Sequence, residues 1–197
     1  MTSATQKSFQ KHIWKYYHSS GRDFAWRNTK DPYAILLSEI MLQQTHVSRV
    51  EEKYPQFLSV FPTVAELANA SLASVVRAWQ GMGYNRRAKH LKHAAEIITE
   101  QYSGYVPDAW ENLVNLPGIG PATTGGVLSS AFNKPVVFIE TNIRRVFIHH
   151  FFQNKEGVGD REILPLVEQT LDHHNPREWY WALFDYGTHL AKHPQSQ

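Results

Sequence analysis

Apolar residues recur at intervals of three and four positions through most of the chain, the spacing of one face of a helix. The pattern predicts helices near the N-terminus and over residues 33–42, 46–61, 64–70, 72–79, 85–102, 110–116, 122–132, 141–152, 161–172 and 177–192. Residues 136–140, "VVFIE", indicate a short extended segment. Short helices joined by short loops, with no internal repeat, favour a compact all-α fold.

Polar residues mark the expected starts of several of these helices. Asp31 is suited to cap a helix that has Pro32 at its first position. Thr45, Thr63 and Ser71 stand directly before three further apolar segments. We therefore expect a helix to begin at each of these positions.

The composition is that of a globular protein rather than a disordered one, with 42% hydrophobic and 19% charged residues in a chain of 197. The absence of cysteine excludes disulfides, thiolate catalysis, iron–sulfur clusters and cysteine-ligated zinc. No apolar run approaches the ~20 residues of a membrane span. The first residues lack the hydrophobic block of a signal peptide. We expect a cytoplasmic protein with no membrane partner.

Positive charge is segregated although the formal net charge is only +2. Residues 67–95 contain no acid, and neither do residues 112–139. The basic residues within or directly after these stretches include Arg77, Arg86, Arg87, Lys89, Lys92, Arg144 and Arg145. This segregation indicates either a polyanion partner or a solvated helix face.

The segment "LPGIGPATTGGVL", residues 116–128, indicates a tight turn between two helices. Gly118 and Gly120 permit positive φ and a close approach of the backbone. Their N–H groups, with those that begin the next helix, would form a nest of donors suited to one phosphate. The alternative is an ordinary helix–helix turn, in which glycine is common.

Several motifs together resemble the helix-hairpin-helix (HhH-GPD) DNA glycosylase superfamily. They are "DPYAILLSEIMLQQTHVSRV", "FPTVAELANASLASVVRAWQGMGYNRRAKHL", the "LPGIG" turn and "ETNIRRV", and they are most similar to the adenine DNA glycosylase branch. The resemblance covers roughly residues 24–150. It implies two helical lobes with a DNA-binding cleft between them. One lobe would be a six-helix barrel-like domain over residues 21–135, with the helix-hairpin-helix near 112–132. The other would combine residues 1–20 and 136–197.

The resemblance implies that Glu39 is the general acid. Glu39 is the sole acid in the body of its helix, and its neighbours at helical spacing are Ile35, Leu36 and Leu42. We expect desolvation to raise the pKa of Glu39, which suits a group that delivers a proton to a departing base. The alternative is a glutamate at a solvent-exposed gap.

The resemblance implies a second catalytic carboxylate at Glu140, accompanied by Asn142. The family carries an aspartate at the Glu140 position, where it supports the cationic transition state and positions water. Glutamate is one methylene longer, which puts the geometry in doubt. Glu140 could instead cap the helix that follows, and both roles could hold together.

DNA contacts are expected at Gln43 and Gln44, which would reach into the duplex, and at Tyr84, which would stack on bases. Arg86 and Arg87 are expected to contact phosphates. The alternatives are ordinary polar residues at a helix end for the glutamines, and a core position for Tyr84.

The hairpin residues expected to hold a phosphate of the target strand are Gly118, Gly120, Ala122 and Thr123. Family members that also nick the strand carry a lysine at the Ala122 position, which forms a Schiff base with the sugar. Alanine has no amine, so we expect a monofunctional enzyme without lyase activity.

The chain departs from the family at its C-terminal end. The resemblance implies four cysteines that ligate an iron–sulfur cluster, but the sequence has none. We also expect the protein to do without the separate domain that reads the opposite base in the adenine branch. Its adjacent histidine pairs, 149–150 and 173–174, are poorly placed to share a metal. We therefore expect no metal and no cofactor, apart from room for a monovalent cation at the hairpin carbonyls.

The sequence thus predicts a nucleoid-associated, monomeric base-excision enzyme. It would hydrolyse the N-glycosidic bond of a mispaired base in double-stranded DNA, with adenine opposite guanine or 8-oxoguanine as the first choice. One alternative is a thymine or uracil glycosylase at G mismatches. The other is a catalytically silent protein that binds lesions or DNA structures.

Overall fold

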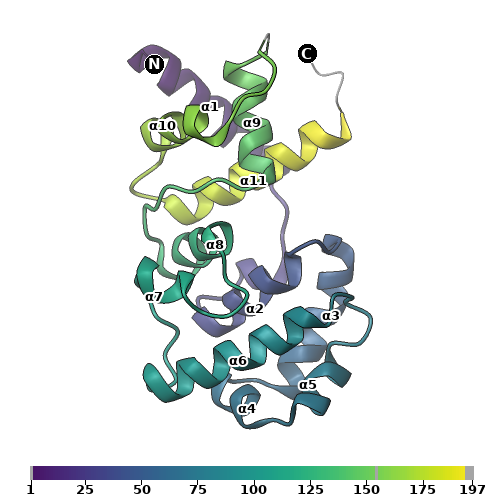
Figure 1. Cartoon of the computed structure of the whole chain (residues 1–197). Helices are drawn as coiled ribbons and strands as arrows, with labels where there is room; N and C mark the ends of the chain where they lie inside the picture. Colours follow the sequence, from purple (N-terminus) through teal and green to yellow (C-terminus); the bar gives the residue numbers. More distant parts are fainter. Residues whose placement is uncertain (1, 154, 194–197) are drawn as a thin grey trace. The chain divides into compact units, whose positions relative to one another are not determined.

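The protein is built from helices in residues 2–153 and 155–193, the part that the computed structural model describes (Figure 1). The elements are α1 (Ser3–Ser20), the 3-10 helix η1 (Ala25–Arg27), α2 (Pro32–Leu42), α3 (Val47–Val60), α4 (Val64–Asn69), α5 (Leu72–Ala78), α6 (Arg86–Gln101), α7 (Trp110–Val114), α8 (Pro121–Phe132), α9 (Thr141–Phe151), α10 (Asp160–Thr170) and α11 (Pro176–Lys192). No β-strand occurs within these described ranges, which confirms the predicted all-α class.

The predicted extended segment, residues 136–140, has no partner strand in the described structure. Instead, the segment contacts α11 through one backbone carbonyl and one aromatic side chain. The Tyr180 hydroxyl donates to the Val136 carbonyl at 2.6 Å, and the Phe138 and Tyr180 rings lie 4.4 Å apart. The segment is a linker that packs against a helix.

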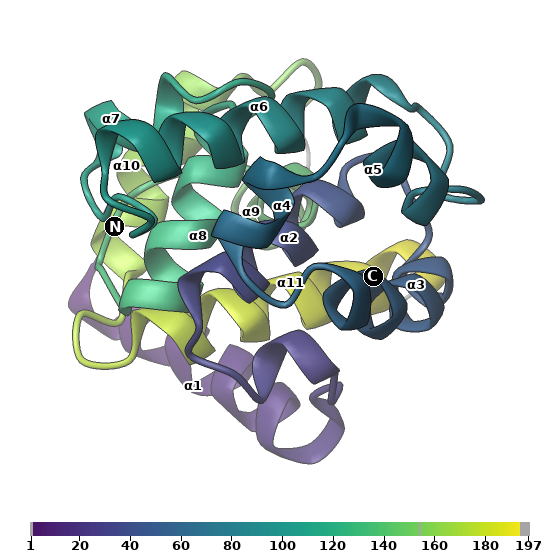
Figure 2. The same cartoon turned by 90° about the horizontal axis from the view of Figure 1, so that it is seen from below.

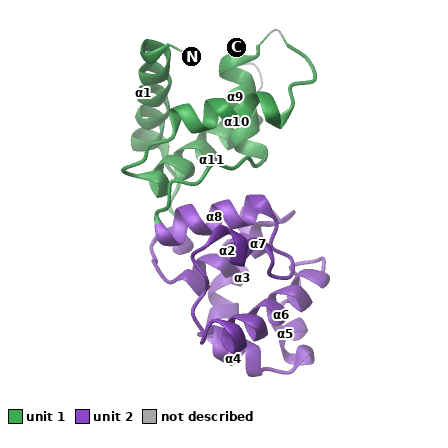
Figure 3. Cartoon of the chain, turned by 60° about the vertical axis from the view of Figure 1, so that its left-hand side comes forward, with its two compact units in different colours: residues 1–23, 133–197 green, residues 24–132 purple. Residues whose placement is uncertain are grey.

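The chain divides into two compact units (Figure 3). The middle unit is Phe24–Phe132, and the terminal unit combines Met1–Asp23 with Asn133–Gln197. The boundaries expected from the sequence, 21–135 and 1–20 with 136–197, each lie three residues from these. The middle unit holds seven α-helices, α2 to α8, rather than the six expected.

Helix α2 is the centre of the middle unit. Eight of its eleven residues are buried, and it packs against η1, α3, α6 and α8 (Figure 2). Such a helix is apolar on nearly every face because it is surrounded by protein. Even so, no helix among the described residues is both long and apolar enough to cross a membrane.

Most of the expected helix starts are confirmed by their hydrogen bonds. Asp31 accepts from the Tyr33 N–H at 3.0 Å, and Thr63 forms a capping box with Glu66. Ser71 caps α5. The prediction for Thr45 is wrong by one residue, because α3 begins after His46. The Thr45 hydroxyl is used elsewhere, as the acceptor of an arginine described below.

The terminal unit has an aromatic core. Helix α9 packs on α11 and α10, and α1 packs on α10 and α11 (Figure 1). Phe9 of α1 contacts the rings of Phe147 and Trp179 at centroid distances of 5.3 Å and 6.1 Å. Because aromatic rings remove large areas from water, packing of this kind can hold the unit together.

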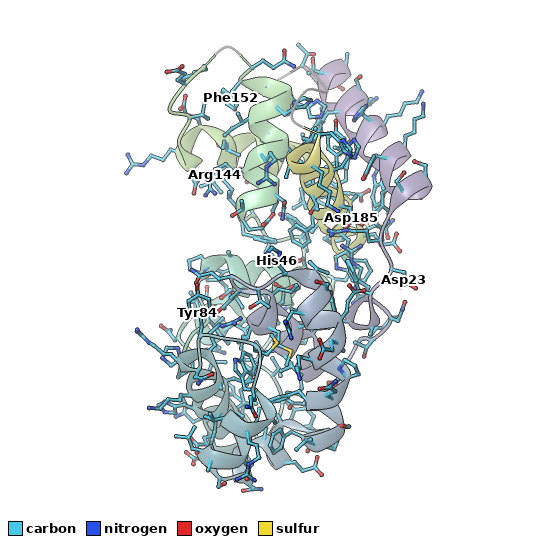
Figure 4. The ribbon with its side chains drawn as sticks, turned by 90° about the vertical axis from the view of Figure 1, so that its right-hand side faces the viewer. Asp23, His46, Tyr84, Arg144, Phe152 and Asp185 are labelled. Carbon is cyan, nitrogen blue, oxygen red and sulfur yellow. The ribbon has the colours of Figure 1, made fainter. Side chains whose placement is uncertain are left out.

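A buried ion pair fastens the segment after α1 to α11. Asp185 is 2% exposed and accepts from the Arg22 backbone N–H at 2.8 Å and from Arg22 Nε at 2.7 Å (Figure 4 labels Asp185). A carboxylate buried to this extent needs such partners.

His150 is a histidine kept neutral inside the terminal unit. Its ring packs edge-on to Phe9, and its Nε2 is buried with no hydrogen-bond partner among the described residues. Burial, followed by the nearby His149 and His12, lowers the pKa of His150 from 6.5 to about 4.

This depressed pKa predicts acid sensitivity. The unfolded chain takes up the proton first, so the contribution of His150 to the free energy of unfolding is complete above pH 6.5 and is lost as the pH falls towards about 4. The loss should reach up to ~3 kcal/mol. Urea titrations across this range should give a flatter profile for His150→Phe than for the native protein. The exposed His174, changed to Phe, should leave the profile unaltered; equal slopes for His150→Phe and native would contradict the prediction.

Candidate functional site

The carboxyl group of Glu39 lies against a glycine of α8. Glu39 is partly buried, on a helix whose Ile35 and Leu36 are almost fully buried. A Cβ placed on Gly126 would lie 2.5 Å from Glu39 Oε2. The missing side chain of Gly126 therefore provides the space in which this carboxyl sits.

Gln43 was expected to reach into the duplex, but its side chain is turned toward the hairpin. Its side-chain amide donates to the Gly118 carbonyl at 3.1 Å and to Thr123 Oγ1 at 3.0 Å. Thr123 is itself 8% exposed. These hydrogen bonds join the end of α2 to the hairpin. Contact of Gln43 and Thr123 with DNA stays a prediction.

The side chains of Gln44 and Tyr84 are exposed to solvent. The backbone of both residues is in the left-handed region, with φ of 52° and 46°. Gln44 is exposed, and Tyr84 is 65% exposed at the edge of its unit (Figure 4). A core position for Tyr84 is therefore excluded. Non-glycine residues seldom adopt positive φ, so these two are unusual.

The two neighbouring arginines are separated by the fold. Arg86 is exposed at the first position of α6 and remains a candidate phosphate contact. Arg87 is 9% exposed, and its guanidinium donates to Met41 O at 2.9 Å and to Met82 O at 3.0 Å. The prediction that Arg87 contacts phosphate is wrong, because its side chain points into the protein and binds backbone carbonyls.

The two hairpin glycines, Gly118 and Gly120, differ in backbone conformation and in the space around their Cα atoms. Gly118 has φ of +77°, and a Cβ there would meet His90 Cβ at 2.8 Å. Gly120 does not have the expected positive φ. Apart from its chain neighbours, no atom of the described residues would lie within 4 Å of a Cβ on Gly120. The fold thus requires glycine at 118, whereas Gly120 leaves the backbone open at the start of α8.

The start of α8 has the features of an anion site. Pro121 is its first residue, and the N–H groups of a first helical turn have no partners within the helix. Ala122 is exposed there. The Gly118 carbonyl accepts from Gln43 Nε2, and the Gly120 carbonyl accepts from the Thr124 N–H. A monovalent cation bound to these oxygens would therefore compete with the two hydrogen bonds.

Glu140 belongs to the terminal unit, whereas Glu39 belongs to the middle unit. Glu140 is the N-cap of α9, and its Oε1 accepts from the Ile143 N–H at 2.8 Å. Its Oε2 accepts from Asn142 Nδ2 at 3.2 Å. The helix-cap role is thus present, and it leaves further lone pairs of the carboxylate available.

A chain of hydrogen bonds extends from Glu140 to α11. Arg145 Nη1 donates to Asn142 Oδ1 at 2.8 Å and to the Gly187 carbonyl at 2.9 Å. A Cβ on Gly187 would lie 2.6 Å from both the Cβ and the carbonyl oxygen of Asn142. The roles of Arg145 and Gly187 were not expected. A lone glycine inside a helical pattern was the available signal for Gly187.

Burial raises the pKa of Glu140 above its ordinary value of 4.5. Hydrogen bonds from Asn142 and Ile143 and the charge of Arg145 act in the opposite direction. Burial is the larger effect, and the fixed donors around Glu140 reduce the rise in its pKa.

Neither the ligands of an iron–sulfur cluster nor a group of transition-metal ligands is found among the residues that the structure describes. The sequence has no cysteine to ligate a cluster. Within the described ranges, no group of three or more His, Asp or Glu side chains could hold a metal ion.

Comparison with known proteins gives a consistent family. Residues 37–165 match the family described as HhH-GPD superfamily base excision DNA repair protein. The chain is 30% identical over 191 residues to the adenine DNA glycosylase of Buchnera aphidicola subsp. Acyrthosiphon pisum, covering 95% of this chain and 55% of that protein. It is 43% identical over 132 residues to the adenine DNA glycosylase of Mycobacterium tuberculosis, covering 66% and 43%. The chain thus spans about half the length of the curated relatives it matches.

Solved structures share the fold. A thermostable thymine-DNA glycosylase superposes with a TM-score of 0.86 at 26% identity, covering 93% of this chain and 86% of that one. A trapped endonuclease III–DNA covalent intermediate gives a TM-score of 0.79 at 17% identity, covering 100% and 90%. The second likeness concerns the fold alone.

The two hairpin glycines predict opposite outcomes for the same substitution. Gly118→Ala should lower the free energy of unfolding by about 2 kcal/mol, because alanine at positive φ is strained and would press on His90. Gly120→Ala should keep full stability but weaken duplex DNA binding about tenfold, since a methyl group would obstruct the approach of a phosphate. Urea unfolding and fluorescence-anisotropy titrations measure the two effects.

Gly159 provides the matched control. It is likewise open on its Cβ side and lies outside the hairpin. Gly159→Ala should leave DNA affinity unchanged. Native affinity in Gly120→Ala would mean that the hairpin backbone does not approach a phosphate.

Proposed function

Because this chain belongs to the HhH-GPD superfamily of base excision DNA repair proteins, we propose that it is a monofunctional DNA glycosylase that removes adenine from a mispair. The reaction is hydrolysis of the N-glycosidic bond, which leaves an abasic site. The observation that carries the proposal lies in the middle unit. A partly buried carboxyl at Glu39 is followed, five residues on, by the exposed left-handed Gln44, with exposed Tyr84 in the loop before α6.

Each carboxyl has a distinct role in this reaction. The target base leaves the helical stack before the bond breaks. Glu39, in its apolar helix, delivers a proton to the departing adenine. Glu140, as a carboxylate, stabilises the positive charge that develops on the sugar and orients the attacking water. Two carboxyl groups in different settings are the usual requirement for breaking glycosidic bonds.

Adenine is the preferred base because the curated relatives with 30% and 43% identity are adenine DNA glycosylases. The opposite base is guanine or 8-oxoguanine in this proposal. The protein acts on double-stranded DNA as a monomer and needs no metal. Arg86 and the start of α8 would contact phosphates, and Gln44 and Tyr84 would contact bases.

Thymine opposite guanine is the second candidate. The observation in its favour is the thymine-DNA glycosylase structure, which matches this chain over 86% of its own length, against 55% for the first adenine relative. The thymine-DNA glycosylase of that structure therefore extends little beyond the region that this chain provides.

A panel of duplexes, each with one defined mispair, separates these functions. Adenine opposite guanine, adenine opposite 8-oxoguanine, thymine opposite guanine and uracil opposite guanine are incubated with the protein and then treated with alkali, which cleaves at abasic sites. Release of adenine alone supports the proposal, and release of thymine or uracil supports the second candidate. Binding without release would identify a silent binding protein.

Borohydride should trap no covalent adduct, because Ala122 has no amine.

Glu39→Gln should abolish adenine release while preserving the fold and DNA binding. The amide keeps the shape of the side chain but cannot donate the required proton, and removal of such an acid costs about 100-fold or more in rate. Single-turnover excision measures the effect. Glu51→Gln on α3 is the matched control, since Glu51 is an exposed acid of the same unit and should keep the native rate. Native activity in Glu39→Gln would remove Glu39 from the mechanism.

Glu140→Gln should lower the single-turnover rate about 100-fold, because a charged group facing a cationic transition state contributes several kcal/mol. The native rate should fall as acidification protonates Glu140, with a midpoint above the ordinary 4.5 because its pKa is raised. This acidic limb should be absent from the residual activity of Glu140→Gln.

Two further variants complete the test of Glu140. Glu140→Asp keeps both the charge and a capping oxygen, and should keep the melting temperature while losing part of the rate. If Glu39 and Glu140 serve one reaction, the double Gln variant should be little slower than the slower single variant. A Glu140→Gln variant that cleaves at the native rate would leave Glu140 as a helix cap only.

A further inference from the structure

Arg87 joins the two loops that carry the exposed left-handed residues. Its Nη1 donates to the carbonyls of Ile40, Met41 and Gln43 at 3.0, 2.9 and 2.6 Å. Its Nη2 donates to Thr45 Oγ1 at 2.8 Å, and to the carbonyls of Met82 and Gly83 at 3.0 and 3.3 Å. The first group of acceptors lies at the end of α2 and the second includes the loop before α6.

Two of these acceptors are the carbonyls of the peptide groups that precede Gln44 and Tyr84. The Gln43 carbonyl belongs to the peptide that ends at the Gln44 nitrogen, and the Gly83 carbonyl to the peptide that ends at the Tyr84 nitrogen. The backbone N–H of Arg87 also donates to the Tyr84 carbonyl at 2.9 Å. A hydrogen bond to a peptide carbonyl fixes the orientation of that peptide plane, and so restricts the dihedral angle beside it.

The aromatic neighbours complete the arrangement. The Arg87 guanidinium carbon lies 5.3 Å from the centre of the Trp79 ring and 5.6 Å from that of Tyr84. Trp79 Nε1 donates to the same Gly83 carbonyl at 3.1 Å. A planar guanidinium can stack on a ring and donate from its edge together, which an ammonium group cannot do.

We propose that Arg87 is a positioning residue that holds Gln44 and Tyr84 together in the left-handed conformations in which they engage the mispaired duplex. Non-glycine residues remain at positive φ only where their surroundings determine it. Arg87 supplies that constraint to both loops from one buried group. The inference rests on the proposed function, since it assigns the exposed side chains of these loops to the target site.

The test compares Arg87→Lys with Arg49→Lys, a change at an exposed arginine on α3 of the same unit. Both changes keep the positive charge, but only Arg87→Lys removes a fork of donors that binds carbonyls. The DNA carries 2-aminopurine beside the target adenine of an A·G mispair, and its fluorescence rises when the neighbouring base leaves the stack. Affinity, fluorescence and single-turnover excision are measured on mispaired and fully matched duplexes, per active protein from a stoichiometric titration.

Arg87→Lys should bind matched duplex within about twofold of native, since the phosphate contacts remain. It should lose about tenfold in affinity for the mispair, in excision rate, or in both, together with the fluorescence rise. Arg49→Lys should retain all three. Equal loss on matched and mispaired DNA, or an undiminished fluorescence rise, would overturn the inference.

Thr45→Val keeps the test decisive if Arg87→Lys does not fold. Valine matches threonine in shape but removes the hydroxyl that accepts from Arg87 Nη2. It should give a smaller loss of the same kind, confined to mispaired DNA, and no such loss would overturn the inference. Native protein that excises no base from any duplex would instead refute the proposed function. The fluorescence rise on binding would still report on Arg87.

Discussion

A helix that ends inside a protein must find partners for its last carbonyl groups, and the end of α2 meets this requirement with one arginine. The C-terminal end of a helix also carries partial negative charge, so a cation is favoured there. Arg87 satisfies the carbonyls of Ile40, Met41 and Gln43 from a neighbouring helix. Because Glu39 lies on the same final turns of α2, the carboxyl and the loops beyond it share a single anchor.

Glycines inside helices place the candidate catalytic groups in both units. Gly126 leaves room for the Glu39 carboxyl, and Gly187 for Asn142 beside Glu140. Glycine within a helix costs about 1 kcal/mol relative to alanine. Alanine would be more favourable for the helix at Gly126 and Gly187, but its Cβ would lie within 2.6 Å of the Glu39 or Asn142 side chain. In each unit a helix–helix contact, rather than a loop, positions the functional group, which favours a precise arrangement.

The sequence predicted local features well and the burial of individual polar residues poorly. Asp31, Thr63 and Ser71 cap helices as expected because a cap depends on neighbours two or three residues away. Arg86 and Arg87 look alike in a basic run, yet one is exposed and the other is buried. Their difference depends on where α6 meets α2, which is a tertiary contact. The hydrogen bonds of Gln43 to the hairpin could not be predicted for the same reason, since its partners Gly118 and Thr123 lie 75 and 80 residues away.

In the proposed reaction, one carboxylate of Glu140 would serve both as a helix cap and as a catalytic group. As a cap it accepts from Ile143, and Asn142 binds its other oxygen. Burial alone would favour the neutral acid, which could not stabilise a cation on the sugar. The two hydrogen bonds and the charge of Arg145 oppose that effect. The donors that begin α9 therefore favour the carboxylate form, although burial still leaves the pKa of Glu140 raised. Arg145, which also donates to the Gly187 carbonyl, holds the side chain of Asn142 in place.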